Sequence, residues 1–287
     1  MPDLPAAPPP ILTLRAPRAS ERALLDLARA FRLKASERAG TISRDGAIFR
    51  YAEGPFDLTL YRASGAFRFK DRTRWQIDHR SHVELSDEDA VSLARAHLRR
   101  YRLLPADARV LRVSRLHVAA AGPERKIEDH RVIDVAVCLQ PTVRGVPLDG
   151  PGGKVTVYLD HEGKMTGLDH VSRRIGPVYK PVPRLHPPDR ALDEARRSWE
   201  RRGVPDVEVR EVRFCYFEAG WNDVQRYLQP AYIVLATLFG SDPRIRMNDI
   251  YVTPAAVNHV GRIVAAAPAK RGAQRPREDP GASSGPR

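Results

Sequence analysis

The sequence has little cysteine and no long apolar run, and both absences exclude classes of protein. Its two cysteines, Cys138 and Cys215, lie in apolar segments and lack the C-x-x-C spacing of redox and zinc sites. We interpret them as buried free thiols, with a disulfide between the two as the open alternative. A membrane-spanning helix needs about 20 consecutive apolar residues, and no stretch has them. The sequence therefore predicts neither a cysteine metal site nor a membrane span.

The first residues also lack the pattern of a secretory signal. Residues 1–10 are rich in proline, without a basic segment followed by an apolar one. As read, the chain is expected in the cytoplasm, whereas a trimmed form of an exported protein would place it outside. Residues 265–287, rich in alanine, proline, glycine, serine and arginine, predict a disordered basic tail.

Acidic residues are fewer than basic ones, at 35 against 48, which gives a formal net charge of +13. Most of the basic residues are arginines, which pair well with carboxylates and phosphates but are also abundant in proteins of high-GC genomes. A nucleic-acid site would need these arginines on one face, and the sequence does not show that. We therefore do not expect nucleic acid as the partner.

Motifs of nucleotide, metal and hydrolase sites are missing as well. The segment GPGGK at 150–154 lacks the spacing of a phosphate loop and precedes a predicted strand instead of a helix. His161-Glu162 is not followed by the second histidine of HExxH, and we interpret it as a turn. His79 and His82 lack a third clustered ligand. We expect no metal and no cofactor.

What the sequence does contain is a unit of one amphipathic helix and three strands that occurs twice. The predicted elements of the first copy are a helix at 87–101 and strands at 110–120, 131–143 and 154–160. Those of the second are a helix at 190–202 and strands at 208–217, 228–239 and 249–253. This order predicts an α+β fold of tandem antiparallel units, each with its helix packed on a curled sheet.

The same pattern divides the chain into five parts. The first third has a predicted helix after Ser20 and three short strands, and it is either a degenerate copy of the repeat or a separate α+β unit. The predicted parts are a flexible segment at 1–18, an N-terminal unit at 19–83, repeats at 84–178 and 179–264, and the tail at 265–287.

The segment GVPLDG at 145–150, a strand at 155–159 and the turn DHEGKM at 160–165 resemble PepSY-type domains and the propeptide (FTP-PepSY) domains of thermolysin-like proteases. YLQPAY at 227–232 is similar to a strand motif of the same superfamily, which includes the tandem PepSY-like regulatory proteins of the YycI/YycH group. The resemblance covers 86–260 and implies a PepSY/cystatin-like fold and a non-catalytic role in binding, inhibiting or chaperoning a partner. In these families the partner is often a peptidase and the location usually outside the cytoplasm. The chain departs from them in lacking a signal, a membrane anchor and a peptidase domain.

Two classes of function remain open. The first is a regulatory protein that binds a protein, peptide or small ligand on a concave sheet; the second is a small-molecule isomerase, cyclase or hydrolase with an Asp/His pair in a cavity. Trp221 stands out because it lies in a polar loop, without a periodic reason to be buried. The candidate binding residues are Trp221, Tyr232, Asn248, Asp249, His170 and Asp160. No residue is predicted as catalytic.

Overall fold

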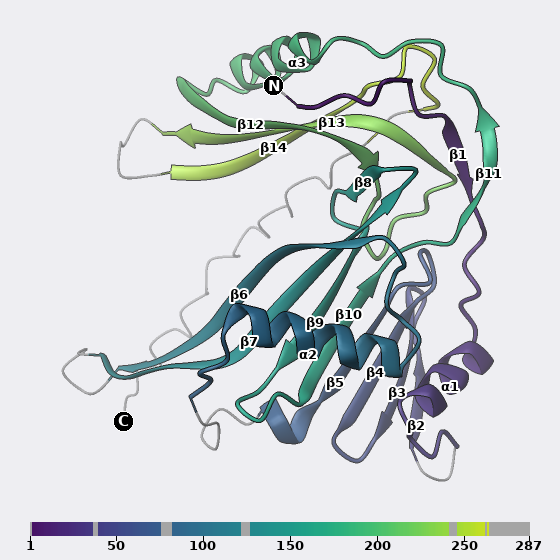
Figure 1. The fold of residues 1–287 in the computed structure, drawn as a ribbon, viewed down its shortest axis with the longest axis vertical. Coiled ribbons are helices and arrows are strands. Elements are labelled where there is room, and N and C mark those ends of the chain that lie inside the picture. Colours follow the sequence, from purple (N-terminus) through teal and green to yellow (C-terminus); the bar gives the residue numbers. More distant parts are fainter. Residues whose placement is uncertain are drawn as a thin grey trace, which may run out of the picture.

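The strands among the described residues join into one hydrogen-bonded sheet of 14 strands that folds into two lobes (Figure 1). The computed structural model describes residues 2–36, 40–75, 82–121, 127–240, 246–261 and 263. We call the part with α1 and α2 the lower lobe and the part with α3 the upper lobe. Each lobe buries its own apolar cluster.

The lower lobe is an antiparallel sheet with strand order β6-β7-β9-β10-β5-β4-β3-β2. Its strands alternate apolar and polar residues, so one face is buried under the helices. The bounds are β2 (Thr41–Arg44), β3 (Ile48–Glu53), β4 (Phe56–Tyr61), β5 (Phe67–Asp71), β6 (Ala108–Ala121), β7 (Ile127–Val143), β9 (Lys154–Leu159) and β10 (Met165–Val171). A short 3-10 helix, η1 (Arg72–Trp75), follows β5.

Two capped helices cover the buried face of this sheet. Helix α1 (Glu21–Ala30) begins after Ser20, whose hydroxyl accepts a hydrogen bond from the Ala23 amide at 3.2 Å. Helix α2 (Asp87–Arg100) begins in the same way after Ser86, which accepts from the Asp89 amide at 3.0 Å. Both helices pack against one apolar cluster on the sheet.

The upper lobe is a second antiparallel region with one helix on its outer face (Figure 1). Its strands are β1 (Ile11–Leu14), β11 (Ile175–Lys180), β12 (Asp206–Phe217), β13 (Tyr227–Phe239) and β14 (Arg246–Pro254). Helix α3 (Pro188–Arg201) starts with a proline, which costs nothing at a position without an intrahelical N–H partner. It buries Trp199 against the sheet.

One short strand, β8 (Val146–Asp149), connects the lobes. It forms a hairpin with β7 and pairs in parallel with the end of β12, where Leu148 lies opposite Tyr216 and Asp149 opposite Phe217. The cluster of the upper lobe therefore includes Val146 and Leu148, although the strand follows directly from the lower sheet.

The predicted α+β fold of tandem helix-plus-three-strand units is wrong, and so is the resemblance to PepSY-like domains and the YycI/YycH group. The structure is mostly β, with 14 strands in one sheet and three α-helices among the described residues. The physical reason is long-range pairing: β5 pairs with β10, β1 with β13 and β8 with β12. These ladders cross the predicted unit boundaries, so the strands do not close into separate repeats.

Parts of the predictions concern residues that the structure does not describe, namely the tail at 265–287 and His79. The segment predicted as flexible, 1–18, contains β1, which pairs with both β11 and β13. Among the described residues, every helix is too short or too polar to cross a bilayer.

Candidate functional site

A cleft of about 610 Å3 lies between the two lobes. Strands β12, β13 and β14 of the upper lobe form its floor, strand β6 of the lower lobe faces them, and the turn after β8 closes one end. We use "cleft" for this space throughout. Its volume is within the range of about 300 to 1,000 Å3 that is common for small-molecule sites.

The floor of the cleft is the face of the upper sheet that α3 does not cover. Along β13 the side chains alternate, so that Tyr232 and Val234 pack under α3 while Ile233 and Leu235 face the other way. The apolar residues of this floor are Phe217, Ile233, Leu235, Ile250 and Val252. A ligand with an apolar part would therefore lose water-exposed surface by lying here.

Three charged side chains stand at the closed end of the cleft. The Lys154 Nζ donates to Asp149 Oδ1 at 3.0 Å, and the Arg213 Nη1 lies 3.4 Å from Asp149 Oδ2. The Gly150 amide also donates to Asp149, at 2.7 Å, and Arg213 pairs with Glu211 at 2.6 Å. The carboxylate thus has a donor on each of its oxygens before any ligand arrives.

This environment keeps Asp149 ionised. Burial by itself raises the pKa of Asp149, but Lys154, the Gly150 amide and Arg213 outweigh it, so the pKa of this carboxyl is below its ordinary value. A general base needs a pKa near the working pH and a free lone pair toward the substrate. Asp149 therefore suits an electrostatic role better than proton transfer.

Cys215 lies on the same face of β12 and is not an activated thiol. It is buried in the cluster beneath the floor, and burial raises its pKa well above the ordinary value. Reactive cysteines have lowered pKa values and some exposure. Cys138 on β7 is also buried, and both cysteines are free, which confirms the interpretation as buried thiols.

The open rim of the cleft is polar and basic. Leu111 and Arg112 reach it from β6, and Asn248 reaches it from β14. Arg112 is exposed and has no ion-pair partner among the described residues. A cation without a partner at the mouth of an apolar cleft favours ligands that carry negative charge.

Behind the closed end, a buried ion pair fixes the loop between β12 and β13. The amide of Arg173 donates to Glu218 Oε1 at 2.8 Å, and its guanidinium donates to the backbone oxygens of Ala219, Gly220 and Asp223 at 2.6 to 2.8 Å. Burial raises the pKa of Glu218 to about 7 despite the neighbouring Arg173. Glu218 does not line the cleft, so its raised pKa reflects its burial at the contact between the lobes.

Trp221, which the sequence suggested as a recognition residue, lies in this same loop and contacts the lower lobe. Its ring centroid is 4.7 Å from that of Tyr61, and the Arg68 guanidinium carbon is 4.9 Å from the ring centroid. Arg68 is held in turn by Asp169 through two hydrogen bonds of 2.6 and 2.9 Å. Trp221 thus connects the lobes and does not line the cleft.

The other three candidates of the upper lobe, Tyr232, Asn248 and Asp249, do not all point to the same face of the sheet. Tyr232 is buried under α3 and donates to the backbone oxygen of His186 at 2.7 Å. Asp249 reaches the cleft rim, but its carboxylate accepts from Trp199 Nε1 at 2.6 Å and pairs with Arg202 at 3.0 Å. Only Asn248 of this set faces the cleft without such a partner.

Asp160 and His170 lie at opposite ends of the β9–β10 hairpin, so the structure does not bring them together. Asp160 pairs with Arg74 and accepts from the amides of Glu162 and Lys164 in the turn. His170 lies opposite Val155 at the far end and stacks on Phe67 at 5.0 Å. An enzyme built on this Asp/His pair would need a contact that the hairpin register does not provide.

Within the described residues, no three histidine, cysteine or acidic side chains are grouped to hold a metal ion. Of the two histidines that lie close together in the sequence, His79 is outside the described part, and the His82 Nδ1 accepts from the Val132 amide at 3.1 Å. The absence of a metal or cofactor therefore stays a prediction.

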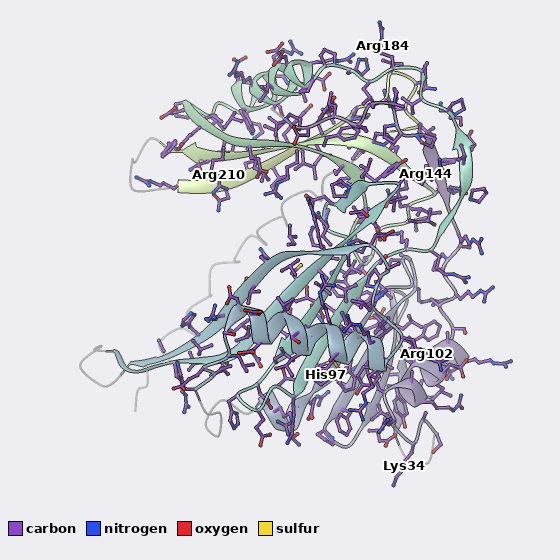
Figure 2. The ribbon with its side chains drawn as sticks, in the orientation of Figure 1. Lys34, His97, Arg102, Arg144, Arg184 and Arg210 are labelled. Carbon is purple, nitrogen blue, oxygen red and sulfur yellow. The ribbon has the colours of Figure 1, made fainter. Side chains whose placement is uncertain are left out.

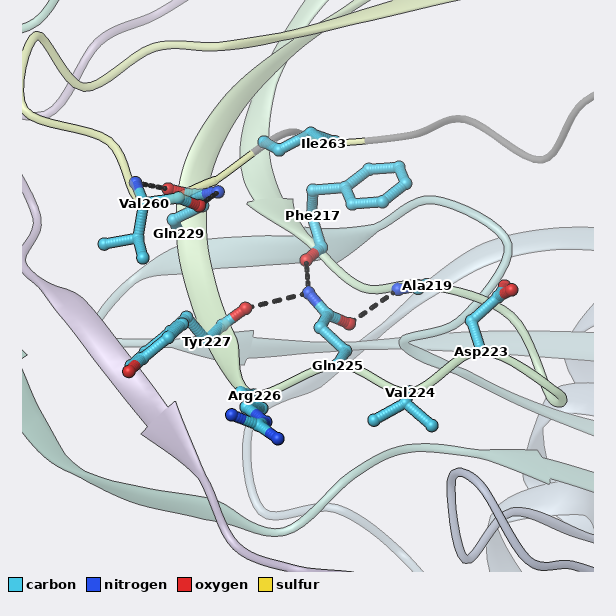
Figure 3. A pocket seen from close by; sticks show the side chains of 10 residues that line it. All are labelled: Phe217, Ala219, Asp223, Val224, Gln225, Arg226, Tyr227, Gln229, Val260 and Ile263. Atoms are coloured by element: carbon cyan, nitrogen blue, oxygen red, sulfur yellow. Dashed lines mark hydrogen bonds between the residues drawn. The ribbon is translucent and has the colours of Figure 1, made fainter.

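A second hollow of about 350 Å3 lies on the other side of Phe217 (Figure 3). Two of its polar side chains already have backbone partners: Gln225 bonds the backbone of Phe217, Ala219 and Tyr227, as Figure 3 shows. Gln229 likewise donates to and accepts from the backbone of Val260 at 3.0 and 2.9 Å. Both glutamines of this hollow are thus used to fix the surrounding backbone, while Arg226 at its edge is exposed.

Comparisons with known proteins find a similar fold but assign no function. No protein-family model matches the sequence. No curated protein matches it either. The structure is similar to that of an uncharacterized protein from Eubacterium rectale ATCC 33656, with a TM-score of 0.55 and 13% sequence identity over 90% of this chain and 86% of that one. At this identity the similarity concerns the fold alone.

Sequence reasoning missed the residues that shape the cleft, above all Asp149, Lys154, Arg213 and Arg112. Asp149 and Lys154 lie in a glycine-rich turn, and Arg213 is one of many arginines. They meet because β8 pairs with β12, which is 60 residues or more away in the chain. The sequence gives one signal for two of these residues, because Asp149 and Lys154 are charged and lie on either side of a glycine-rich turn.

Proposed function

We propose that this protein binds, without chemically converting it, a ligand that has an apolar part and a negatively charged group, in the cleft between its lobes. The observation that carries the proposal is the pairing of an apolar floor with a basic rim in an open cleft of about 610 Å3. The apolar part would lie on Ile233, Leu235 and Ile250, and the charged group would lie toward Arg112, Lys154 and Arg213.

The state of the charged residues supports binding over catalysis. Asp149 is ionised and hydrogen-bonded on both oxygens, and Cys215 is buried with a raised pKa. Asp149 could take a proton from a ligand only after losing these hydrogen bonds. Cys215 could attack a ligand only after becoming exposed and deprotonated. The alternative of an enzyme with an Asp/His pair gains no support from the candidates Asp160 and His170, which lie at opposite ends of their hairpin.

The proposal is tested with an apolar anionic dye, anilinonaphthalene sulfonate, as the probe. Ile250 is 54% exposed on the cleft floor, so Ile250→Glu should preserve the fold while adding repulsion and removing apolar surface. We expect dye affinity to fall at least about tenfold, the scale of a hot-spot truncation of about 1.4 kcal/mol or more.

The matched control is Val178→Glu, because Val178 is 43% exposed on β11, which does not line the cleft. This variant makes the same kind of change and should leave dye affinity unchanged. Equal losses in both variants, or none in either, would place the dye elsewhere and reject the cleft as the binding site.

A further inference from the structure

Strand β14 is an open edge of the upper sheet that borders the cleft. It pairs with β13 through nine consecutive residue pairs without a register shift, and no other described strand pairs with it. An edge of this kind presents a row of unpaired N–H and C=O groups. Exposed edges usually carry a bulge, proline or charged residues as protection; in β14 these are limited to Arg246 at its start, Asp249, which is paired with Arg202, and Pro254 at its end.

Large apolar side chains are exposed on both faces of this edge. Ile250 is 54% exposed on the cleft side, and Met247, three residues earlier in the same strand, is 56% exposed on the opposite face. Most described apolar side chains of this size are covered, so two on one strand mark a surface that gains from being covered.

Positive charge also flanks β14 on both faces. On the cleft face Arg112 lies at the rim without an ion-pair partner among the described residues, and Lys154 and Arg213 share Asp149. On the other face, α3 packs against β14 with Arg202 paired to Asp249. Burial is the main cause of the raised pKa of Tyr251; Glu194, which also accepts from Thr253 at 2.6 Å, adds to it, whereas Arg201 and Arg197 of α3 oppose it.

We propose that an extended acidic peptide segment adds to the outer edge of β14 as a further antiparallel or parallel strand, with its cleft-facing side chains reaching over Ile250 toward the cleft. This inference rests on the proposed function and gives it a partner class. In a strand, successive side chains point to opposite faces, so apolar and acidic residues of the peptide would meet Ile250 and Arg112 in the cleft. The others would meet the arginines of α3.

A second copy of this chain fits the same edge less well. Pairing β14 with β14 of another molecule would bring two arginine-flanked edges together, and like charges across strands are destabilising. An acidic peptide would instead be attracted to the arginines beside β14, and the +13 net charge of the whole chain would attract it over a longer range.

The test selects random nine-residue peptides, one residue for each of the 9 in β14, by phage display on the full chain. We expect enriched sequences to carry glutamate or aspartate together with apolar residues. Enrichment of basic peptides, or no enrichment, would overturn the proposal.

The selected peptide is then synthesised in two forms, each N-methylated at every second residue. Because only one edge of an added strand faces β14, one form should lose binding at least about tenfold and the other should keep it. If both forms bind like the unmodified peptide, strand addition is wrong. If Ile250→Glu still weakens dye binding in that case, the proposal of a ligand site in the cleft remains valid without the peptide.

Charge is tested by Arg112→Glu, which should weaken peptide binding at least about tenfold. The control is Arg184→Glu, which changes the net charge equally at the outer end of the upper lobe, away from the cleft (Figure 2). Equal effects of the two variants would show general attraction instead of a site. A rise in the molecular mass of the unliganded protein with concentration, removed by Ile250→Glu, would favour self-pairing and reject the peptide.

Discussion

Asp149 is a single residue that serves both lobes. Its backbone oxygen accepts from the Glu218 amide at 2.8 Å, while its side chain holds Gly150, Lys154 and Arg213. Truncating one partner of such a buried group leaves the others unsatisfied, which usually costs more than the bond itself. The charged groups around Asp149 therefore stabilise the fold at the closed end of the cleft, and they would affect ligand binding mainly through that role.

His170 allows a prediction about pH. Burial lowers the pKa of His170 to about 4, so it stays neutral in the folded protein over a range in which the unfolded chain takes up a proton. As the pH falls from about 6.5 toward 4, this difference lowers the free energy of unfolding by about 1.4 kcal/mol per pH unit. Above about pH 6.5 the residue contributes no pH dependence.

The measurement is urea unfolding of the wild type and His170→Phe at about pH 7.5 and about pH 5. Phenylalanine keeps the stacking on Phe67 but cannot be protonated, so the variant should lose about 2 kcal/mol less between the two conditions. An equal loss in both proteins would mean that His170 is protonated in the folded state.

At the scale of elements, the turn between β8 and β9 and the end of β12 approach each other too closely for side chains. A Cβ on Gly150 would lie 2.5 Å from the Glu218 oxygen, and one on Gly152 would overlap the Ala219 oxygen and approach Glu218 Cγ to 2.9 Å. The Gly152 amide also donates to the Glu218 oxygen at 2.9 Å. Glycine is needed at these positions for backbone approach, and the closed end of the cleft depends on it.

Gly152→Ala should therefore destabilise the protein by about 1 to 3 kcal/mol, the usual cost of overpacking. Chemical denaturation measures this loss. Gly46→Ala is the control, because a Cβ on Gly46 meets no atom within 4 Å, and its stability should stay close to that of the wild type. If both alanines are tolerated, the turn has room to move.

At the scale of the whole molecule, the two lobes meet at the β8–β12 pairing and at the loop that carries Trp221. The loop is fixed from behind by Arg173 and reaches Tyr61 and Arg68 in front. These contacts lie beside the cleft and hold together the two lobes that line it. Ligand binding and lobe docking are thus physically linked.

Trp221→Ala tests this link. Losing the contacts with Tyr61 and Arg68 should lower the free energy of unfolding by about 1 to 2 kcal/mol, the sum of an aromatic pair and a cation–π contact. The control in the same loop is Val224→Ala, since Val224 is 78% exposed. Wild-type stability in Trp221→Ala, together with weaker ligand binding, would instead return Trp221 to the role of a recognition residue.

The sequence by itself determined the local elements. Ser20 and Ser86 marked the starts of α1 and α2 because an N-cap is a local interaction, and alternating residues marked strands such as β9 and β13. Strands β1, β2, β8 and β11 were missed because prolines and glycines, which are also typical of turns, lie in or beside them.

Only the tertiary structure decided which strands pair and hence where a site lies. The pairing of β5 with β10 and of β8 with β12 joins segments far apart in the chain, and alternation within a strand carries no information about its neighbour. The prediction of tandem units failed for that reason. It also explains why Asn248 could be chosen from the sequence, whereas Arg112, Asp149 and Arg213 become one site only through the contact of the two lobes.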